Sequence, residues 1–148
     1  MLTSPILLSD VVAQVESNNN PLAMRFEEAA YKANSPTAAS HLAIHRYATG
    51  GYVSLYTAHM IAYTSWGKYQ IMGYNLYGKC GWQHPLADFL ITDDAQIAMF
   101  RRFIAPKFSD VPFPTMAEHE LLAFAKMYNG NGPVYSDALK TAYREMTA

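Results

Sequence analysis

The stretch that decides how this chain is organised is SWGKYQIMG, residues 65–73. Gly67 and Gly73 bracket Tyr69 and Gln70, with a second aromatic residue, Trp66, just before the first glycine, and glycines at such spacing are typical of tight turns. The surrounding region, residues 52–82, is rich in glycine, serine and tyrosine, and predicts short helix, turn and a small hairpin between Ser65 and Ile71. A second interpretation is a tight turn followed by a buried helix start, with Trp66 and Ile71 in the core.

Outward from this stretch, apolar residues recur at helical spacing on both sides. The predicted helices cover residues 5–17, 22–33, 37–47, 86–90, 92–105, 115–128 and 136–146. Strand signals are weak elsewhere, and no repeat or linker divides the chain. The sequence therefore predicts one mainly α domain over residues 1–148, with at most a small β-hairpin region.

The expected helix ends rest on capping residues. Ser4, Thr92, Thr115 and Ser136 are candidate N-caps, the Thr115 position forming a capping box with Glu118. Two asparagine-containing turns, residues 18–21 and 129–130, are expected to end the first and the sixth helix.

Composition excludes several classes of protein. Hydrophobic residues make up 51% of the chain and charged residues 16%, which argues against disorder. The formal charge of −1, without a basic block, makes nucleic acid a poor partner and gives little attraction to acidic envelopes. No apolar run is long enough to span a bilayer, so no membrane insertion is expected, and the N-terminus does not read as a signal peptide.

The cysteines and histidines of the chain do not form a pattern typical of disulfides or metal sites. Cys80 is alone, and we expect a structural thiol. His41 and His45 lie at i,i+4, but no HExxH context or third ligand accompanies them. We therefore expect no metal and no cofactor.

Glu16 is the acid whose position is least ordinary. It follows Val12 by one helical turn and so lies beside the apolar stripe of its helix. It also lies in the last turn, where the negative end of the helix dipole disfavours a carboxylate. Both effects favour the protonated acid that a glycosidase uses to protonate a leaving oxygen. The alternative is a stripe-edge glutamate paired with a lysine or arginine.

A glycosidase usually needs a second carboxylate. Glu27 and Glu28 follow soon after Arg25 and Phe26, and either could return across a turn to face Glu16. Surface pairing of Glu27 with Arg25 is the alternative. The other acids considered are better explained as caps or first-turn residues: Asp88, Asp93, Asp94 and Glu118.

Two polar segments could hold a sugar. The 65–73 loop brings backbone amides, the Gln70 amide and a flat ring to one surface, an arrangement that can pair the groups of an N-acetyl sugar. Tyr128 ends a strong amphipathic helix before Asn129 and Gly130 and could point its hydroxyl into a cleft. Its alternative is a core tyrosine in a capping turn.

Taken in order, these pieces resemble the lysozyme-like lytic transglycosylases and phage muramidases. VES at residues 15–17 resembles their glutamate–serine motif, residues 63–73 resemble their Ser-Trp-Gly-x-x-Gln-Ile-Met-Gly segment, and residues 128–130 are similar to their tyrosine–asparagine–glycine turn. The run from Asp88 to Phe103, which includes Gln96, is also similar to the stretch between the two later motifs. The similarity spans residues 11–143, and three motifs in the right order are specific.

The resemblance implies a lysozyme-like helical fold and a peptidoglycan-degrading enzyme with Glu16 as general acid. It implies that Ser17 orients site groups, that Asn129 holds the late turn, and that Tyr128 bonds near Glu16. It also strengthens Glu27 as a site carboxylate. The residues expected to line the sugar cleft are Ser65, Tyr69, Gln70 and Ile71.

The chain departs from the family at Lys68, where an apolar residue is more common, and by the lack of a separate wall-binding module. The bond expected to be cut joins N-acetylmuramic acid to N-acetylglucosamine. Hydrolysis, favoured by Glu27, and transglycosylation to a 1,6-anhydro end both stay open, and the rival class is a non-catalytic glycan-binding or virion module. We expect a phage protein that acts on glycan strands, either released through a holin from the host cytoplasm to the periplasm or carried in a virion or tail assembly.

Overall fold

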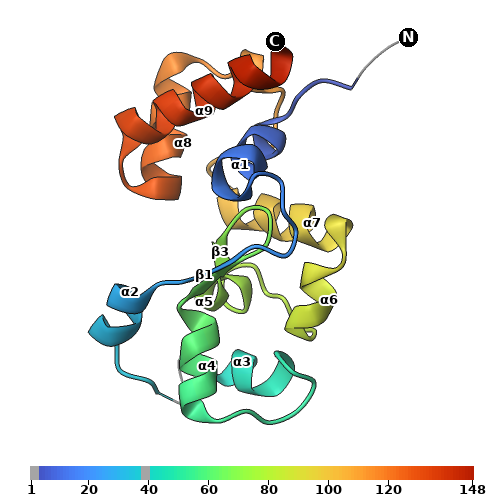
Figure 1. Cartoon of the computed structure of the whole chain (residues 1–148), viewed down its shortest axis with the longest axis vertical. Coiled ribbons are helices and arrows are strands. Elements are labelled where there is room, and N and C mark those ends of the chain that lie inside the picture. The colour runs from blue at the N-terminus through green and yellow to red at the C-terminus, as the bar shows by residue number, and fades with distance from the viewer. Residues whose placement is uncertain (1–3, 38–40) are drawn as a thin grey trace.

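The structure is a computed structural model that describes residues 4–37 and 41–148. Helices dominate it, and a small antiparallel sheet lies between two groups of helices (Figure 1). One group holds α1 (Leu8–Ser17), α8 (Glu118–Asn129) and α9 (Gly132–Thr147). The mainly α prediction with a small β region is confirmed.

Helix α1 begins at Leu8, so the predicted start at residue 5 with Ser4 as its cap is wrong. The preceding residues are held extended against another segment: the Leu8 amide donates to the Val111 carbonyl (2.8 Å), and the Phe113 amide donates to the Ile6 carbonyl (2.9 Å). The helix ends as predicted, at a left-handed turn in which Asn18 has a φ of 53°.

Three short strands form the sheet, in the order β1 (Met24–Phe26), β2 (Thr64–Trp66) and β3 (Ile71–Met72). The predicted hairpin is therefore confirmed. The predicted helix over residues 22–33 is wrong in its first half, which becomes β1, and only α2 (Glu28–Ala33) is helical. Strand β1 forms because the hairpin offers a free edge, and this pairing partner is distant in sequence.

The register of the sheet assigns its two faces. Met24 pairs with Trp66 and Phe26 with Thr64, while Arg25 between them pairs with Ser65. Because successive strand residues point to opposite faces, Arg25 and Ser65 share the face opposite Trp66.

The second group of helices carries the middle of the chain: α3 (Leu42–Tyr47), α4 (Leu55–Ala62), α5 (Gly73–Leu76), α6 (Leu86–Leu90) and α7 (Asp93–Ile104). The first residues of the helix predicted over 37–47 lie partly outside the described residues. The predictions of α6 and of α7, with Thr92 at its N-cap position and acids in its first turn, are confirmed.

Two predicted caps near the C-terminus are wrong. Thr115 belongs to the 3₁₀ turn η1 (Phe113–Thr115), and α8 starts three residues later, where the Glu120 carboxylate accepts from the Ala117 amide (3.2 Å). Ser136 is buried inside α9, whose cap is Asn131: its side chain accepts from the Val134 amide. The stop after α8 is confirmed, with Gly130 at a φ of 91°.

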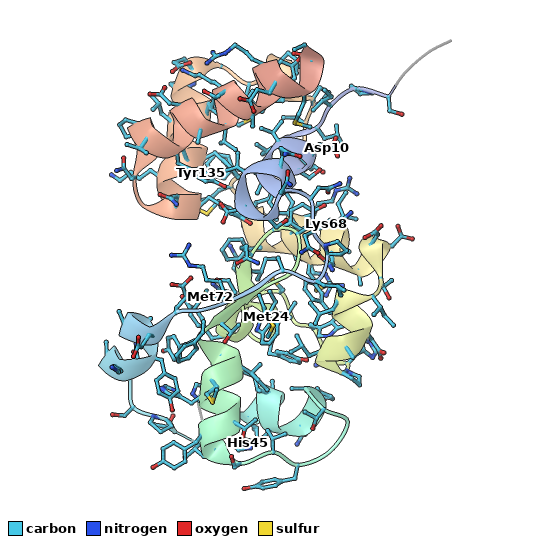
Figure 2. All side chains as sticks on the ribbon, viewed as in Figure 1. Asp10, Met24, His45, Lys68, Met72 and Tyr135 are labelled. Atoms are coloured by element: carbon cyan, nitrogen blue, oxygen red, sulfur yellow. The ribbon has the colours of Figure 1, made fainter. Side chains whose placement is uncertain are left out.

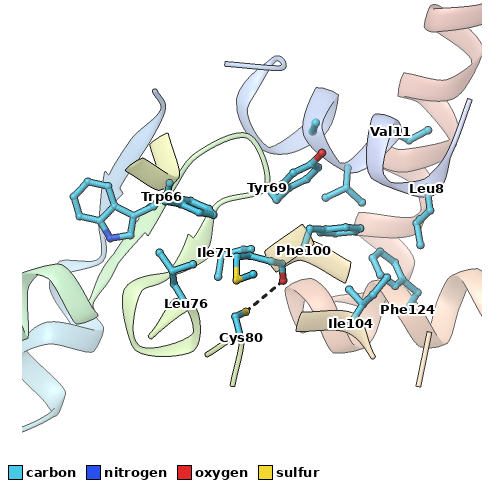
Figure 3. Close-up of a cluster of buried hydrophobic side chains, with 14 of the residues drawn as sticks. Leu8, Val11, Trp66, Tyr69, Ile71, Leu76, Cys80, Phe100, Ile104 and Phe124 are labelled. Atoms are coloured by element: carbon cyan, nitrogen blue, oxygen red, sulfur yellow. Dashed lines mark hydrogen bonds between the residues drawn. The ribbon is translucent and has the colours of Figure 1, made fainter. Parts of the chain in front are cut away.

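The core runs between the helices and behind the hairpin (Figure 3). Phe100 and Phe124 are fully buried, and the Tyr69 ring stacks on Phe100 with 4.6 Å between centroids. Cys80 is buried with its Sγ 3.4 Å from the Met99 carbonyl, and burial raises the pKa of this thiol to about 11, which fits the predicted structural role. Among the helices described, none combines the length and the apolar character that crossing a membrane would require.

Candidate active site

Glu16 lies in the last turn of α1 and is half-buried against α9. The Tyr135 hydroxyl donates a hydrogen bond to its Oε2 at 2.7 Å. Tyr135, labelled in Figure 2, is itself buried in the first part of α9, so the carboxyl group is held by a fixed donor. We call this side of the site, built by α1, α8 and α9, the helical wall.

The pKa of Glu16 is raised above its ordinary value, chiefly because burial penalises the carboxylate. The nearby charge of Glu27 acts in the same direction, whereas the Tyr135 hydrogen bond and the charge of Arg25 lower the pKa. Burial outweighs both opposing effects, so this site favours the protonated acid.

Tyr128 supports Tyr135 from α8. Their rings stack with 6.0 Å between centroids and 13° between planes. The Tyr128 hydroxyl donates to the Tyr69 carbonyl, and burial raises its pKa well above the ordinary value. The resemblance implied that Tyr128 hydrogen-bonds near Glu16. Tyr128 lies close enough for the charge of Glu16 to raise its pKa as well, but the hydroxyl that bonds to the acid comes from Tyr135, and Tyr128 connects the helical wall to the hairpin.

Ser17 makes a second connection to the hairpin. Its hydroxyl donates to the Lys68 carbonyl (2.8 Å) and accepts from the Asn20 amide (3.1 Å). The serine after the acid therefore fixes the end of α1 relative to the hairpin turn.

The hairpin turn is shaped by two residues with positive φ, Gly67 at 78° and Gln70 at 52°. The Gln70 side chain folds back and donates to the Gly67 carbonyl (3.0 Å) while staying half-exposed. Ser65 donates to the Met72 sulfur at 3.0 Å. Among the predicted sugar-binding residues of the hairpin, Gln70 is thus the one with an accessible side-chain amide.

The remaining predicted site residues differ in how much of their side chains a ligand could reach. The side chains of Tyr69 and Ile71 are buried, so only their backbone could meet a ligand. Asn129 is exposed at the end of α8, and the side chain that caps the following turn is Asn131. The Lys68 ammonium pairs with Asp93 at 3.2 Å, so its charge is partly neutralised.

Arg25 and Glu27 stand on the sheet side. They are two residues apart at the end of β1, and Arg25 Nε lies 3.4 Å from Glu27 Oε1, which places both side chains on the face opposite Trp66. The Glu27 amide donates to the Tyr63 carbonyl (2.9 Å) and fixes the backbone there. We call this side, built by β1 and the hairpin, the strand wall.

The histidines are engaged elsewhere. His41 Nε2 lies 2.8 Å from His59 Nδ1, and His45 Nδ1 lies 2.7 Å from the Val53 carbonyl. In the part of the chain that the structure describes, no three histidine, cysteine or acidic side chains are grouped to hold a metal ion.

Comparison with known proteins places the chain in a family. Residues 21–147 match the N-acetylmuramidase family. The chain is also 34% identical over 139 residues to the endolysin of Enterobacteria phage PRD1, covering 91% of this chain and 93% of that protein. This chain belongs to the N-acetylmuramidase family. No solved structure matches it.

Because it belongs to this family, the muramidase is a glycosidase that degrades peptidoglycan. The family match begins after Glu16, so the role of Glu16 rests on the geometry and on the motif at residues 15–17. The non-catalytic alternative is set aside, because the matched family is enzymatic.

Two residues that hold this candidate site together were not predicted from the sequence. Tyr135 was left outside the last predicted helix, although its spacing to Leu139 and Ala142 is helical. Gln96 was noted only within a similar stretch, yet it is fully buried: its amide donates to the Pro21 (2.9 Å) and Leu90 (3.1 Å) carbonyls and its oxygen accepts from the Lys68 amide (2.8 Å). A polar residue within an apolar helical stripe was the available signal.

Proposed function

We propose that this muramidase cuts the β-1,4 bond between N-acetylmuramic acid and N-acetylglucosamine, with Glu16 as its general acid. The observation that carries the proposal is a half-buried carboxyl group with a raised pKa, held by the Tyr135 hydroxyl at 2.7 Å. Such an acid stays protonated closer to neutral pH and can donate its proton to the glycosidic oxygen as the bond breaks.

Glu27 supplies the second carboxylate. It stands on the strand wall, its charge acts on Glu16, and its side chain is one-third exposed, so water and substrate can reach it. Arg25 orients it at 3.4 Å. One buried and one solvated carboxyl group can divide the work, the first as proton donor and the second as charged carboxylate. Glu27 is then the carboxylate that hydrolysis requires in addition to the acid.

A second candidate reaction, lytic transglycosylation, is favoured by the same ion pair. If Arg25 keeps Glu27 engaged, Glu16 alone completes the reaction. It protonates the leaving oxygen as the glycosidic bond breaks, and the muramic acid 6-hydroxyl then attacks the anomeric carbon and gives its proton to the Glu16 carboxylate. The product is then a 1,6-anhydro end rather than a reducing sugar.

Mass spectrometry of muropeptides from purified, lipid-free sacculi tests both parts. We expect products with reducing muramic acid ends from the parent enzyme and none from Glu16→Gln. Anhydro ends from the parent enzyme would show that the reaction is transglycosylation and not hydrolysis, with Glu16 still the acid. Cleavage by Glu16→Gln at the parent rate would overturn the whole assignment.

We further propose that the enzyme acts in phage-induced lysis, on the strength of its likeness to a protein named endolysin. Deleting its gene from the phage genome should delay lysis without lowering the number of particles inside the cell. Its detection in stoichiometric amounts in purified virions, with lysis unaffected, would instead assign it to wall entry.

A further inference from the structure

Charge is unevenly distributed along this chain, although the total is only −1. No aspartate or glutamate lies between Glu28 and Asp88. All 12 acidic residues lie outside that stretch, whereas it carries the basic residues Lys32, Arg46, Lys68 and Lys79. Lys32 is paired with Glu28 and Lys68 with Asp93, so the positive charge of this carboxylate-free stretch comes chiefly from Arg46 on α3 and from Lys79.

Within this stretch, α3, α4 and the loop between them form a tip. It lies at the opposite end of the molecule from α9 (Figure 1), and His45 marks it in Figure 2. A hollow of about 590 Å³ opens here, lined by Leu42, His45, Arg46, Gly51, Tyr52 and Leu55. We call these six residues and Tyr56 the tip surface.

The tip surface exposes apolar and aromatic side chains that a soluble protein usually covers. Tyr52 is 85% exposed, Tyr56 66% and Leu42 57%. The Tyr52 ring stacks on His45 with 5.5 Å between centroids, and the exposed Arg46 guanidinium stands over the Tyr47 ring. Tyrosine, leucine and arginine exposed together are typical of surfaces that lie in the headgroup region of a membrane.

We propose that the tip surface docks on the face of an anionic lipid bilayer. Arg46, with no carboxylate in the stretch around it, meets negative headgroups, and Leu42, Tyr52 and Tyr56 enter the interface, without any helix crossing the membrane. The charge of Arg46 favours an anionic surface, and the exposed Leu42, which has no group to pair a sugar hydroxyl, favours lipid over glycan.

Docking at the tip leaves the active site free. Helix α4 runs from the tip surface to the sheet, and its eight residues span about 12 Å at 1.5 Å per residue. Glu16 lies beyond the sheet, on the helical wall. An enzyme bound by its tip would therefore stay at the membrane while its site faces the wall layer.

The test is cosedimentation of the full-length protein with vesicles at 50 mM and 500 mM salt. We expect binding to phosphatidylglycerol-containing vesicles, no binding to pure phosphatidylcholine, and release at high salt. Arg46→Glu should lower the partition coefficient at least about fivefold, and Tyr52→Ser with Leu42→Ser should lower it by a similar factor. Matched controls on the other helices, Lys107→Glu and Val134→Ser, should bind like the parent.

Several outcomes would overturn the proposal. One is equal binding by the tip variants and their controls, and another is absence of binding at 50 mM salt. If the tip variants bound vesicles like the parent but no longer bound lipid-free sacculi, the tip surface would be assigned to the acidic peptides of the wall. A tip-dependent dimer in analytical ultracentrifugation would assign it to a second copy. Activity on lipid-free sacculi should stay unchanged in every tip variant, which separates this test from that of the catalytic assignment.

Discussion

The helical wall and the strand wall each present one carboxyl group, and they hold it in different ways. Glu16 is half-buried, bonded to the Tyr135 hydroxyl and surrounded by packed helices. Glu27 is partly exposed at a strand end and paired with Arg25, whose side chain is 76% exposed. The same residue type is thus desolvated on one wall and solvated on the other, which is how a fold separates a proton donor from a charged partner.

The largest expected effect comes from removing the acid of the helical wall. Glu16→Gln should lower the rate of sacculus digestion by about 10²–10⁴-fold, because an amide cannot donate the required proton. The variant should stay folded, since its amide oxygen can still accept from Tyr135. Glu145→Gln, an exposed glutamate on α9, is the control and should digest sacculi like the parent.

Glu16→Gln also tests whether burial raises the pKa of Glu16. A raised pKa in the folded state contributes stability that is present below the unfolded pKa and is lost as pH rises through the folded value. The melting temperature of Glu16→Gln should therefore gain on that of the parent as pH rises from the unfolded pKa through the folded one, and the difference should level off at higher pH. A constant difference between the two proteins across pH 4–9 would contradict a desolvated acid.

Removing the carboxylate of the strand wall should have the next largest effect. Glu27→Gln should lower hydrolysis about 10²-fold, while Glu28→Gln, its neighbour on exposed α2, should leave the rate unchanged. Because the charge of Glu27 raises the pKa of Glu16, the alkaline limb of the remaining activity should also move to lower pH. Parent-like turnover with anhydro products would show that the second wall only tunes the first.

The strand wall depends on a close contact between Gly67 and Gln96. A Cβ on Gly67 would lie 2.5 Å from Gln96 Oε1, whereas at Gly50, with nearly the same φ, a Cβ would meet nothing within 4 Å. Gly50→Ala should cost about 1 kcal/mol of unfolding free energy for its backbone alone. Gly67→Ala should cost about 1–3 kcal/mol more, measured by denaturant unfolding. If the two variants lost equal unfolding free energy, the contact with Gln96 would not be what restricts position 67.

The same contrast explains what the sequence could predict. The 65–73 hairpin, the turn after Glu16 and the stop at Gly130 were readable because their backbone shapes depend on local residues. Strand β1 and the true start of α1 were not, because distant segments pair with them. Tyr135 lies 119 residues from Glu16, so their contact is set by the packing of α9 on α1 rather than by any local pattern.

The smallest expected effect comes from removing the hydroxyl group that holds Glu16 on the helical wall. The Tyr135 hydrogen bond lowers the pKa of Glu16 and so works against burial. Tyr135→Phe removes that donor, which should raise the pKa of Glu16 further and move the alkaline limb of the pH–activity profile to higher pH.

At low pH, where the acid is protonated in both proteins, the rates should differ only severalfold, and the unfolding free energy should fall by about 1 kcal/mol. Tyr143→Phe on the same helix is the control and should keep the parent profile. A downward shift of the alkaline limb in Tyr135→Phe would mean that the hydroxyl supports the protonated acid instead. The helical wall would then hold Glu16 as a donor through bonding as well as through burial.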